Sequence, residues 1–251
     1  VDYRDFGGVL TVSEGDELVR REPPTPGIEG KTVTGVAIPP KPGKEIDFKL
    51  NNSVALKEDD PNVLVAQISG QPVITKNGAK VEQVLNLDNL DLNTGHVDFD
   101  GTVVVKGDVI SGMKVKATGD INIGGTVEAA SLEAEGNITV NGGIIGHGSV
   151  RDERGALREE SGYIHSGGTV TARFIKNTYV LANDSIVAKD MINNSEVTCY
   201  NQVVVGGRGG SNKAQVMGGL TRATVRVDAP VLGSPSAAHT PLAAPPPAPD
   251  H

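Results

Sequence analysis

The sequence has few aromatic residues and almost no cysteine. Phe, Trp and Tyr make up 3% of its 251 residues, tryptophan is absent, and Cys199 is the only cysteine. A single cysteine excludes an intrachain disulfide and favours a reducing compartment. With so few rings, a core must be built from Val, Ile, Leu and Ala, and the 32 glycines suit thin stacked strands rather than a bulky globular core.

Excess basic charge and long apolar runs are also missing. The net charge is −8, whereas nucleic acids and anionic membrane surfaces require clustered Lys and Arg, so neither is an expected partner. No run approaches the ~18 apolar residues of a membrane-spanning helix, so no membrane insertion is expected. No signal peptide is visible. Because the chain begins at Val1 rather than Met, we expect that an amino-terminal part has been removed.

A repeat of roughly 17 residues runs through the second half of the chain. Apolar anchor positions recur at steps of 16, 17, 32, 16 and 17 residues: Val105, Ile121, Ile138, Val170, Ile186 and Val203. Six positions before each of the last five anchors stand Val115, Leu132, Ile164, Val180 and Val197. Four positions before the same anchors stand Ala117, Ala134, Ser166, Ala182 and Cys199. Eleven positions before four of these anchors stand Ile110, Val127, Ile175 and Ile192. Helical repeats need about 30 residues or more, so this period predicts a β-solenoid.

The predicted fold is therefore all-β. A right-handed parallel β-helix with about 17 residues per coil should span residues 96–229. The residues two before the last five anchors should form sharp corners with positive φ: Gly119, Gly136, Gly168, Asp184 and Asn201. Cys199 shares a column with Ala and Ser, so we interpret it as a small buried hydrophobe rather than a catalytic thiol.

One coil carries an insertion. Ile144 and Ile164 are 20 residues apart, whereas the corresponding positions of other coils are five apart. The 15 extra residues lie between Gly146 and Gly162 and must loop out, because the columns on both sides keep their register. Two interpretations of this insertion stay open: a solvated surface loop and a contact with a partner. The second has a physical basis, because Arg can pair with carboxylates of a partner. Seven charged residues are the candidate binding set: Arg151, Asp152, Glu153, Arg154, Arg158, Glu159 and Glu160.

The two ends of the chain differ from the repeat. Residues 1–95 contain short β-branched segments bounded by turn residues, at 8–12, 53–56, 63–66 and 72–74, which predicts a small all-β domain. Its Gly30-Lys31-Thr32 is not a phosphate-binding loop, because Thr25 stands where that motif needs its first glycine. Residues 230–251 are rich in Pro and Ala, which predicts a disordered tail.

Catalytic and metal-binding patterns are weak. The five histidines are scattered, and only His147 and His165, which flank the insertion, could approach each other. The glycine clusters precede no predicted helix that could hold a phosphate. We therefore expect no catalytic residues, no cofactor and no metal.

Several segments resemble the flagellar assembly protein A family of bacteria. They are residues 101–109 and 115–128, with their Gly-Asp pairs, residues 142–146, 172–177, 218–219 and 232–234, and the upstream segment 26–35. The resemblance covers roughly residues 7–234. It implies a β domain followed by a right-handed parallel β-helix, in a cytoplasmic bacterial protein of flagellar assembly and motility that is recruited to the cell pole.

The resemblance also implies a mode of action. Members work as non-enzymatic scaffolds or adaptors, and part of the family binds the dephosphorylated glucose-specific IIA protein of the sugar phosphotransferase system. Two alternatives stay open: a self-assembling filament protein resembling the bactofilins, and a β-helix enzyme acting on polysaccharides. Residues 1–95 and an irregular region at 206–228 should cover the two solenoid ends, which predicts a monomer or small oligomer.

Overall fold

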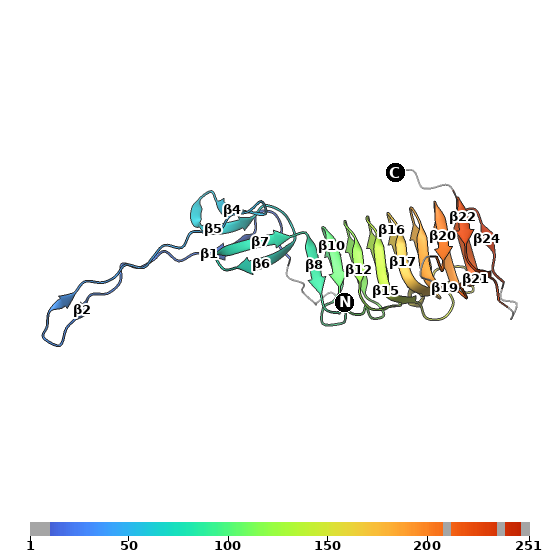
Figure 1. Ribbon diagram of the computed structural model, residues 1–251, viewed down its shortest axis with the longest axis horizontal. Helices are drawn as coiled ribbons and strands as arrows, with labels where there is room; N and C mark the ends of the chain where they lie inside the picture. Colours follow the sequence, from blue (N-terminus) through green and yellow to red (C-terminus); the bar gives the residue numbers. More distant parts are fainter. Residues whose placement is uncertain (1–10, 208–211, 235–238, 247–251) are drawn as a thin grey trace. The chain divides into compact units, whose positions relative to one another are not determined.

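The computed structural model describes residues 11–207, 212–234 and 239–246. The chain forms two compact units, a small β domain within Leu10–Gln83 and a solenoid from Val84 onward (Figure 1). In the described ranges the only helix is the 3-10 turn η2 (Glu159–Ser161), so the all-β prediction is confirmed. Over the same ranges, no helix has the length and apolar character that a membrane crossing requires.

The small β domain is antiparallel. Its strands are β1 (Glu17–Arg20), β2 (Gly30–Lys31), β3 (Ala37–Ile38), β4 (Val54–Lys57), β5 (Asp60–Ala66), β6 (Gln71–Thr75) and β7 (Gly78–Glu82). Strand β5 pairs with β1 and β4, β6 pairs with β7, and β2 pairs with β3. Buried Val54, Ala66 and Val81 form its core. The strand segments expected near residues 53–56, 63–66 and 72–74 are confirmed, while residues 8–10 lie outside the described ranges.

A long hairpin leaves this domain. Every residue from Glu22 to Asp47 is exposed, and we call this segment the arm. It contains Gly30-Lys31-Thr32, which begins in β2 and leads into a tight turn where the Gly35 N–H donates to the Thr32 oxygen at 2.9 Å. The next element is β3 rather than a helix, in agreement with the interpretation of this segment as a structural turn.

The solenoid is built of parallel strands. Its coils begin with β8 (Val84–Leu87), β9 (Val97–Phe99), β10 (Thr102–Val105), β11 (Lys114–Ala117), β12 (Ile121–Ile123), β13 (Val127–Glu128) and β14 (Ser131–Ala134). They continue with β15 (Ile138–Ile145), β16 (Tyr163–Ser166), β17 (Val170–Lys176), β18 (Tyr179–Ala182), β19 (Ile186–Cys199), β20 (Gln202–Val205), β21 (Gln215–Ala223), β22 (Arg226–Asp228), β23 (Val231–Leu232) and β24 (Leu242–Ala243).

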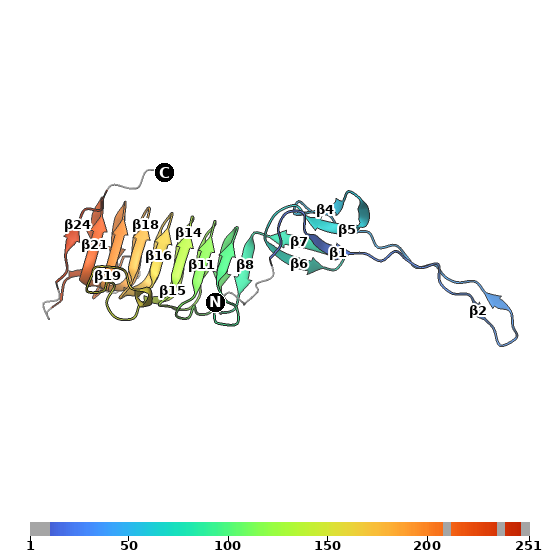
Figure 2. The same cartoon turned by 180° about the vertical axis from the view of Figure 1, so that it is seen from behind.

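The strands form three parallel ladders around one core. The first runs β8, β10, β12, β15, β17, β19, β20 and β22 (Figure 1). The second joins β13 to the later parts of β15 and β17, the middle of β19 and the start of β21. The third runs β9, β11, β14, β16, β18, β19 and β21, and is seen from behind in Figure 2.

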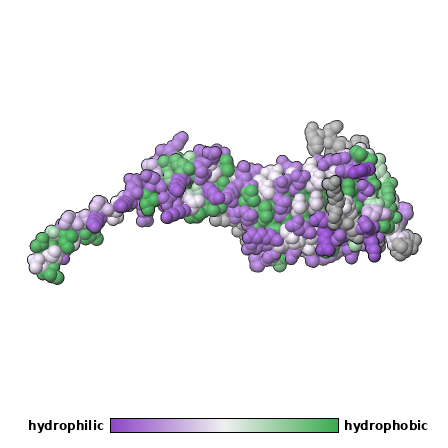
Figure 3. All heavy atoms as spheres, in the orientation of Figure 1, coloured by the Kyte–Doolittle hydropathy of each residue, from purple (hydrophilic) through white to green (hydrophobic). Residues whose placement is uncertain are grey.

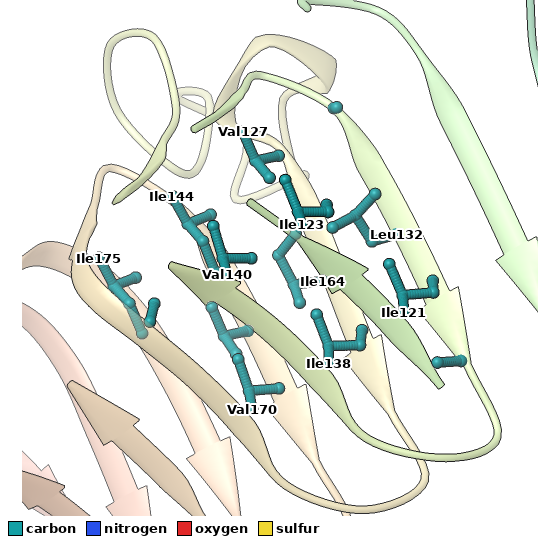
Figure 4. Packing of buried hydrophobic residues seen from close by; sticks show 14 of the residues in the cluster. Ile121, Ile123, Val127, Leu132, Ile138, Val140, Ile144, Ile164, Val170 and Ile175 are labelled. Carbon is teal, nitrogen blue, oxygen red and sulfur yellow. The ribbon is translucent and has the colours of Figure 1, made fainter. Parts of the chain in front are cut away.

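The inward columns confirm the repeat. Val115 pairs with Leu132, Leu132 with Ile164, Ile164 with Val180, and Val180 with Val197, and none of the five is more than 2% exposed. The small column that ends at Cys199 is likewise buried. Figure 4 shows such side chains from neighbouring coils packed against one another. Each coil thus buries its apolar face only by stacking on its neighbours.

Two positions of the expected repeat are wrong. The residue that pairs with Ile121 is Val103, whereas Val105 pairs with Ile123. The residue stacked on Val127 is Val109, which is fully buried, whereas Ile110 is 37% exposed. Both errors fall in runs of consecutive Val or Ile. Such runs carry no alternation that could tell inward from outward positions.

The expected positive φ at the glycine corners is also wrong. Positive φ occurs instead at another corner, at Asn177 (53°) and Asn194 (47°). At the glycine corners the coils approach closely, and the Gly119 N–H donates to the Gly101 oxygen at 2.9 Å. A Cβ on Gly119 would lie 2.9 Å from that same oxygen. At Gly119 the glycine permits close contact between coils rather than a special backbone conformation. Asp184 and Asn201 hold the equivalent corner of later coils without positive φ, and their N–H groups make the same bond at 3.0 Å.

The limits of the solenoid differ from the expected ones. It begins at Val84 instead of residue 96, because β8 already pairs with β10 and buries Leu85. Near the other end, the region expected to be irregular contains β21 and β22. Beyond residue 230, β23 and β24 still pair with β21, so the described part of the expected tail adds strands to the sheet. Residues 208–211, 235–238 and 247–251 lie outside the described ranges.

Candidate functional site

The insertion leaves and rejoins the solenoid through two glycines. Strand β15 ends just before Gly146, whose N–H donates to the Lys176 oxygen at 2.8 Å. A Cβ at this position would collide with the carbonyl oxygens of Asn177 and Ser161, so only glycine fits without rearrangement. The chain re-enters through Gly162, whose φ of 74° favours glycine. Both ends of the insertion therefore lie at one narrow base.

Between these glycines the chain forms a hairpin, residues 147–161, which we call the insertion hairpin. Arg151 and Leu157 form an antiparallel bridge, and the Arg158 N–H donates to the Val150 oxygen at 3.0 Å. The Asp152 carboxylate closes the turn by accepting the N–H groups of Arg154 and Ala156, both at 2.9 Å. Asp152 thus stabilises the hairpin itself.

Arg151 ties the hairpin to the solenoid. Its Nε and Nη2 donate to the two carboxylate oxygens of Glu196 at 2.7 and 2.8 Å, and its Nη1 donates to the Gly155 oxygen at 2.7 Å. The guanidinium lies 6.0 Å from the centre of the Tyr179 ring. The hydrogen bonds to Glu196 raise the pKa of Arg151. A bidentate pair of this kind fixes orientation as well as distance.

The surface beneath the hairpin is an outward column of the third ladder. Tyr163 pairs with Tyr179, which pairs with Glu196. The two tyrosine rings stack with centres 5.7 Å apart and an interplanar angle of 4°. Burial raises the pKa of Tyr163, with smaller contributions from Glu133 and Tyr179. The column therefore places two stacked rings beside the carboxylate that binds Arg151.

The hairpin brings most of the candidate residues together. Arg151, Asp152, Glu153, Arg154, Arg158 and Glu160 line one open depression of about 770 Å³. Glu159 instead lines a cavity of about 450 Å³ between the hairpin and the third ladder. Leu157, Met113, Lys114 and Tyr163 share that cavity with it.

The seven candidate side chains are not equally available. Arg151 is bound to Glu196, Asp152 closes the turn, and Arg158 pairs with Glu160 at 3.6 Å. Within the described part of the chain, the side chains of Glu153, Arg154 and Glu159 have no hydrogen bond or ion pair, and all three are exposed. These three side chains are therefore the most accessible for binding a protein partner.

Other sites considered from the sequence are not assembled. His165 lies on β16 with its ring 6.4 Å from that of Tyr163, and the His147 N–H donates to the Glu160 oxygen. The described residues contain no group of three or more His, Cys, Asp or Glu arranged to hold a metal. Cys199 is fully buried, and burial raises the pKa of its thiol, as expected for a structural cysteine.

Glu196, Tyr163 and Tyr179 were missed from the sequence. Each stands immediately before a residue of the inward column that contains Ile164, Val180 and Val197. Because neighbouring residues of a strand point to opposite faces, the repeat alone could have placed the three in one outward column.

Two family models match the chain. The model of the Flagellar Assembly Protein A beta solenoid domain matches residues 83–247, and the model of the Flagellar Assembly Protein A N-terminal region matches residues 1–77. Searches of curated proteins and of solved structures gave no match. The two matched regions follow the division of the fold into a small β domain and a solenoid. The chain belongs to the flagellar assembly protein A family.

Proposed function

We propose that the chain is a non-enzymatic scaffold or adaptor of flagellar assembly and motility that binds protein partners through the insertion hairpin. It acts in the bacterial cytoplasm and is recruited to the cell pole. The observation that carries the proposal is the bidentate contact of Arg151 with Glu196. A loop held in place before binding loses less conformational freedom when the partner docks.

The charge of the hairpin supports one kind of partner. Its seven charged residues comprise three arginines and four carboxylates, and one arginine is already neutralised by Glu196. The exposed remainder is acidic, so a partner that acquires a phosphate at its contact surface would be repelled. This charge supports the dephosphorylated glucose-specific IIA protein of the sugar phosphotransferase system as the partner.

The test combines binding and motility. A variant with Glu153→Gln, Arg154→Gln and Glu159→Gln removes the three unpaired charges but keeps Arg151 and Asp152. We expect this variant to melt like the parent and to bind the IIA protein at least tenfold more weakly. Surface Glu128→Gln with Lys176→Gln is the matched control on the second ladder. Binding is measured by calorimetry, with the IIA protein phosphorylated and unphosphorylated.

A deletion addresses the whole hairpin. Removal of residues 149–160 should leave the inward columns intact, since loop shortening changes closure entropy by only about 1 kcal/mol. It should not restore motility to a strain that lacks the gene. If a stably folded deletion variant restores motility and partner binding fully, the hairpin is not the contact surface and the proposal fails.

A further inference from the structure

Exposed apolar surface alone does not identify a ligand. The arm carries such surface, since Ile28 is 94% exposed, and Figure 3 shows the hydrophobic colour at its end. The cavity of about 450 Å³ between the insertion hairpin and the third ladder combines apolar residues with charged and polar ones. We call it the hairpin cavity. Such a cavity is more informative, because its polar groups select the chemistry of the ligand.

The apolar residues of the hairpin cavity come from both the solenoid and the hairpin. Met113 and Ala130 belong to the solenoid and are 0% and 2% exposed. Leu157 belongs to the insertion hairpin and is 41% exposed. The protein thus leaves a large aliphatic side chain partly uncovered at the cavity. An apolar group of a ligand that covers Leu157 removes this surface from water, which favours binding.

Three polar residues of the third ladder line the hairpin cavity from one outward column. Lys114 pairs with Ser131, and Ser131 pairs with Tyr163, so the three lie on successive strands at the spacing of ~4.8 Å. They carry an ammonium, a hydroxyl and a phenol, which can all donate hydrogen bonds. In the described part of the chain, none of these three side chains has a hydrogen bond or an ion pair. A row of unpaired donors that includes a cation is suited to a carboxylate.

Glu159 supplies the opposite charge. It lines the same cavity from the 3-10 turn η2 of the hairpin and is exposed. Among the described residues no ion pair joins it to Lys114, although both line one cavity. Arg158 also lines the cavity, but it is paired with Glu160 at 3.6 Å. The hairpin cavity therefore has one unpaired cation on the solenoid and one unpaired anion on the hairpin, together with an apolar surface.

We propose that the hairpin cavity binds a small zwitterion with an apolar side chain, which is the chemistry of an apolar amino acid or dipeptide. Its carboxylate pairs with Lys114 and accepts a hydrogen bond from Ser131 or Tyr163. Its ammonium pairs with Glu159, and its side chain covers Leu157. The volume of about 450 Å³ lies within the range of small-molecule sites. Binding here needs no protein partner, so this site is independent of the proposed contact with the IIA protein.

Calorimetry of the full chain with defined probes tests the site. L-phenylalanine and leucyl-phenylalanine carry both charges, hydrocinnamate lacks the ammonium, and phenethylamine lacks the carboxylate. We expect saturable binding of at least one zwitterion with a Kd of about 1 mM or tighter. The two singly charged probes should bind about tenfold more weakly, because each leaves one charge of the protein unpaired. The tighter zwitterion identifies the source as an amino acid or a peptide. If neither zwitterion binds, or if a singly charged probe binds as tightly as the zwitterions, the proposal is overturned.

Variants of the two charges assign each end of the ligand. Lys114→Gln should weaken binding of the zwitterion about tenfold and remove its advantage over phenethylamine. Glu159→Gln should instead remove its advantage over hydrocinnamate. Lys116→Gln, also on β11, and Glu153→Gln, also on the hairpin, are matched controls because neither residue lines this cavity. Lys114 is not among the seven candidate residues of the hairpin, so Lys114→Gln should bind the IIA protein like the parent, and the two proposals can fail separately. If Lys114→Gln binds the zwitterion as tightly as the parent, the proposal fails.

Discussion

Arg151 and Glu196 lie 45 residues apart in the sequence and form two parallel hydrogen bonds of 2.7 and 2.8 Å. Arg151 belongs to the insertion hairpin after β15, and Glu196 belongs to β19. The side chain of Glu196 is 15% exposed, so its carboxylate is largely shielded on the solenoid side of the contact. This ion pair therefore connects the insertion hairpin to strand β19 of the solenoid.

The first prediction concerns this pair. Glu196→Gln removes the charge that holds Arg151 and keeps the shape of the side chain. We expect trypsin to cleave after Arg154 several times faster than in the parent, because the hairpin opens more often. Asp190→Asn is the control, since it breaks the exposed Arg173 pair (2.8 Å) elsewhere. Equal cleavage rates in all three proteins would show that the pair does not hold the hairpin.

The second prediction tests the inward column. Val180→Asp places an unpaired charge at a position that is 0% exposed and should destabilise the fold by several kcal/mol. Leu181→Asp changes the neighbouring residue on the outward side of β18 and should stay within about 0.5 kcal/mol of the parent. Thermal unfolding followed by circular dichroism measures both. An unchanged melting temperature for Val180→Asp would contradict its burial.

The third prediction concerns the base of the insertion. Gly146→Ala adds a Cβ against the carbonyl oxygens of Asn177 and Ser161, and should cost about 1–3 kcal/mol through overpacking. Gly155→Ala at the hairpin turn has open space around the new Cβ and costs only the strain of its positive φ, about 1 kcal/mol. Denaturant titration compares the two. If Gly155→Ala is the more destabilising change, the base is not tightly packed.

The fourth prediction concerns acid. Hydrogen bonds from Asn201 and then Thr169, at 2.7 and 3.0 Å, lower the pKa of Asp184 from its ordinary value of 3.8. A lowered folded-state pKa contributes stability above the ordinary pKa, and this contribution is lost as pH falls toward the folded value. The melting temperature of Asp184→Asn should therefore fall less than that of the parent between about pH 6 and pH 3.

Glu153→Gln is the control for acid stability. It removes one exposed carboxylate from the hairpin and should follow the parent across the same pH range. Parallel curves for the parent and Asp184→Asn would mean that the Asp184 hydrogen bonds do not differ in strength between the two protonation states.

The columns were predictable wherever apolar and polar residues alternate. Leu132 and Ala134 flank outward Glu133, so their register was correct. Alternation disappears at residues 103–105 and 109–110, and there the register was misplaced. Leu242 could not be assigned either, because a strand of two residues among prolines has too little pattern to stand out from a disordered segment.

The candidate site was predicted only in part. Glycines at both ends and unbroken columns indicated that residues 147–161 loop out. The contact of Arg151 with Glu196 could not be derived from local sequence, since it depends on the direction in which the hairpin folds back. That direction follows from the closed base at Gly146 and the turn at Asp152, which are properties of the three-dimensional arrangement.

The narrow base at Gly146 and Gly162 has a consequence for variation in length. Because entry and exit share one opening between stacked coils, the number of residues between them can change without altering the pitch of the solenoid. Engineered chains should therefore accept different segments here, including a grafted epitope or a fluorescent domain with adjacent termini. Gly146 and Gly162 thus bound a position where one segment can be exchanged for another while the stacking of the coils stays the same.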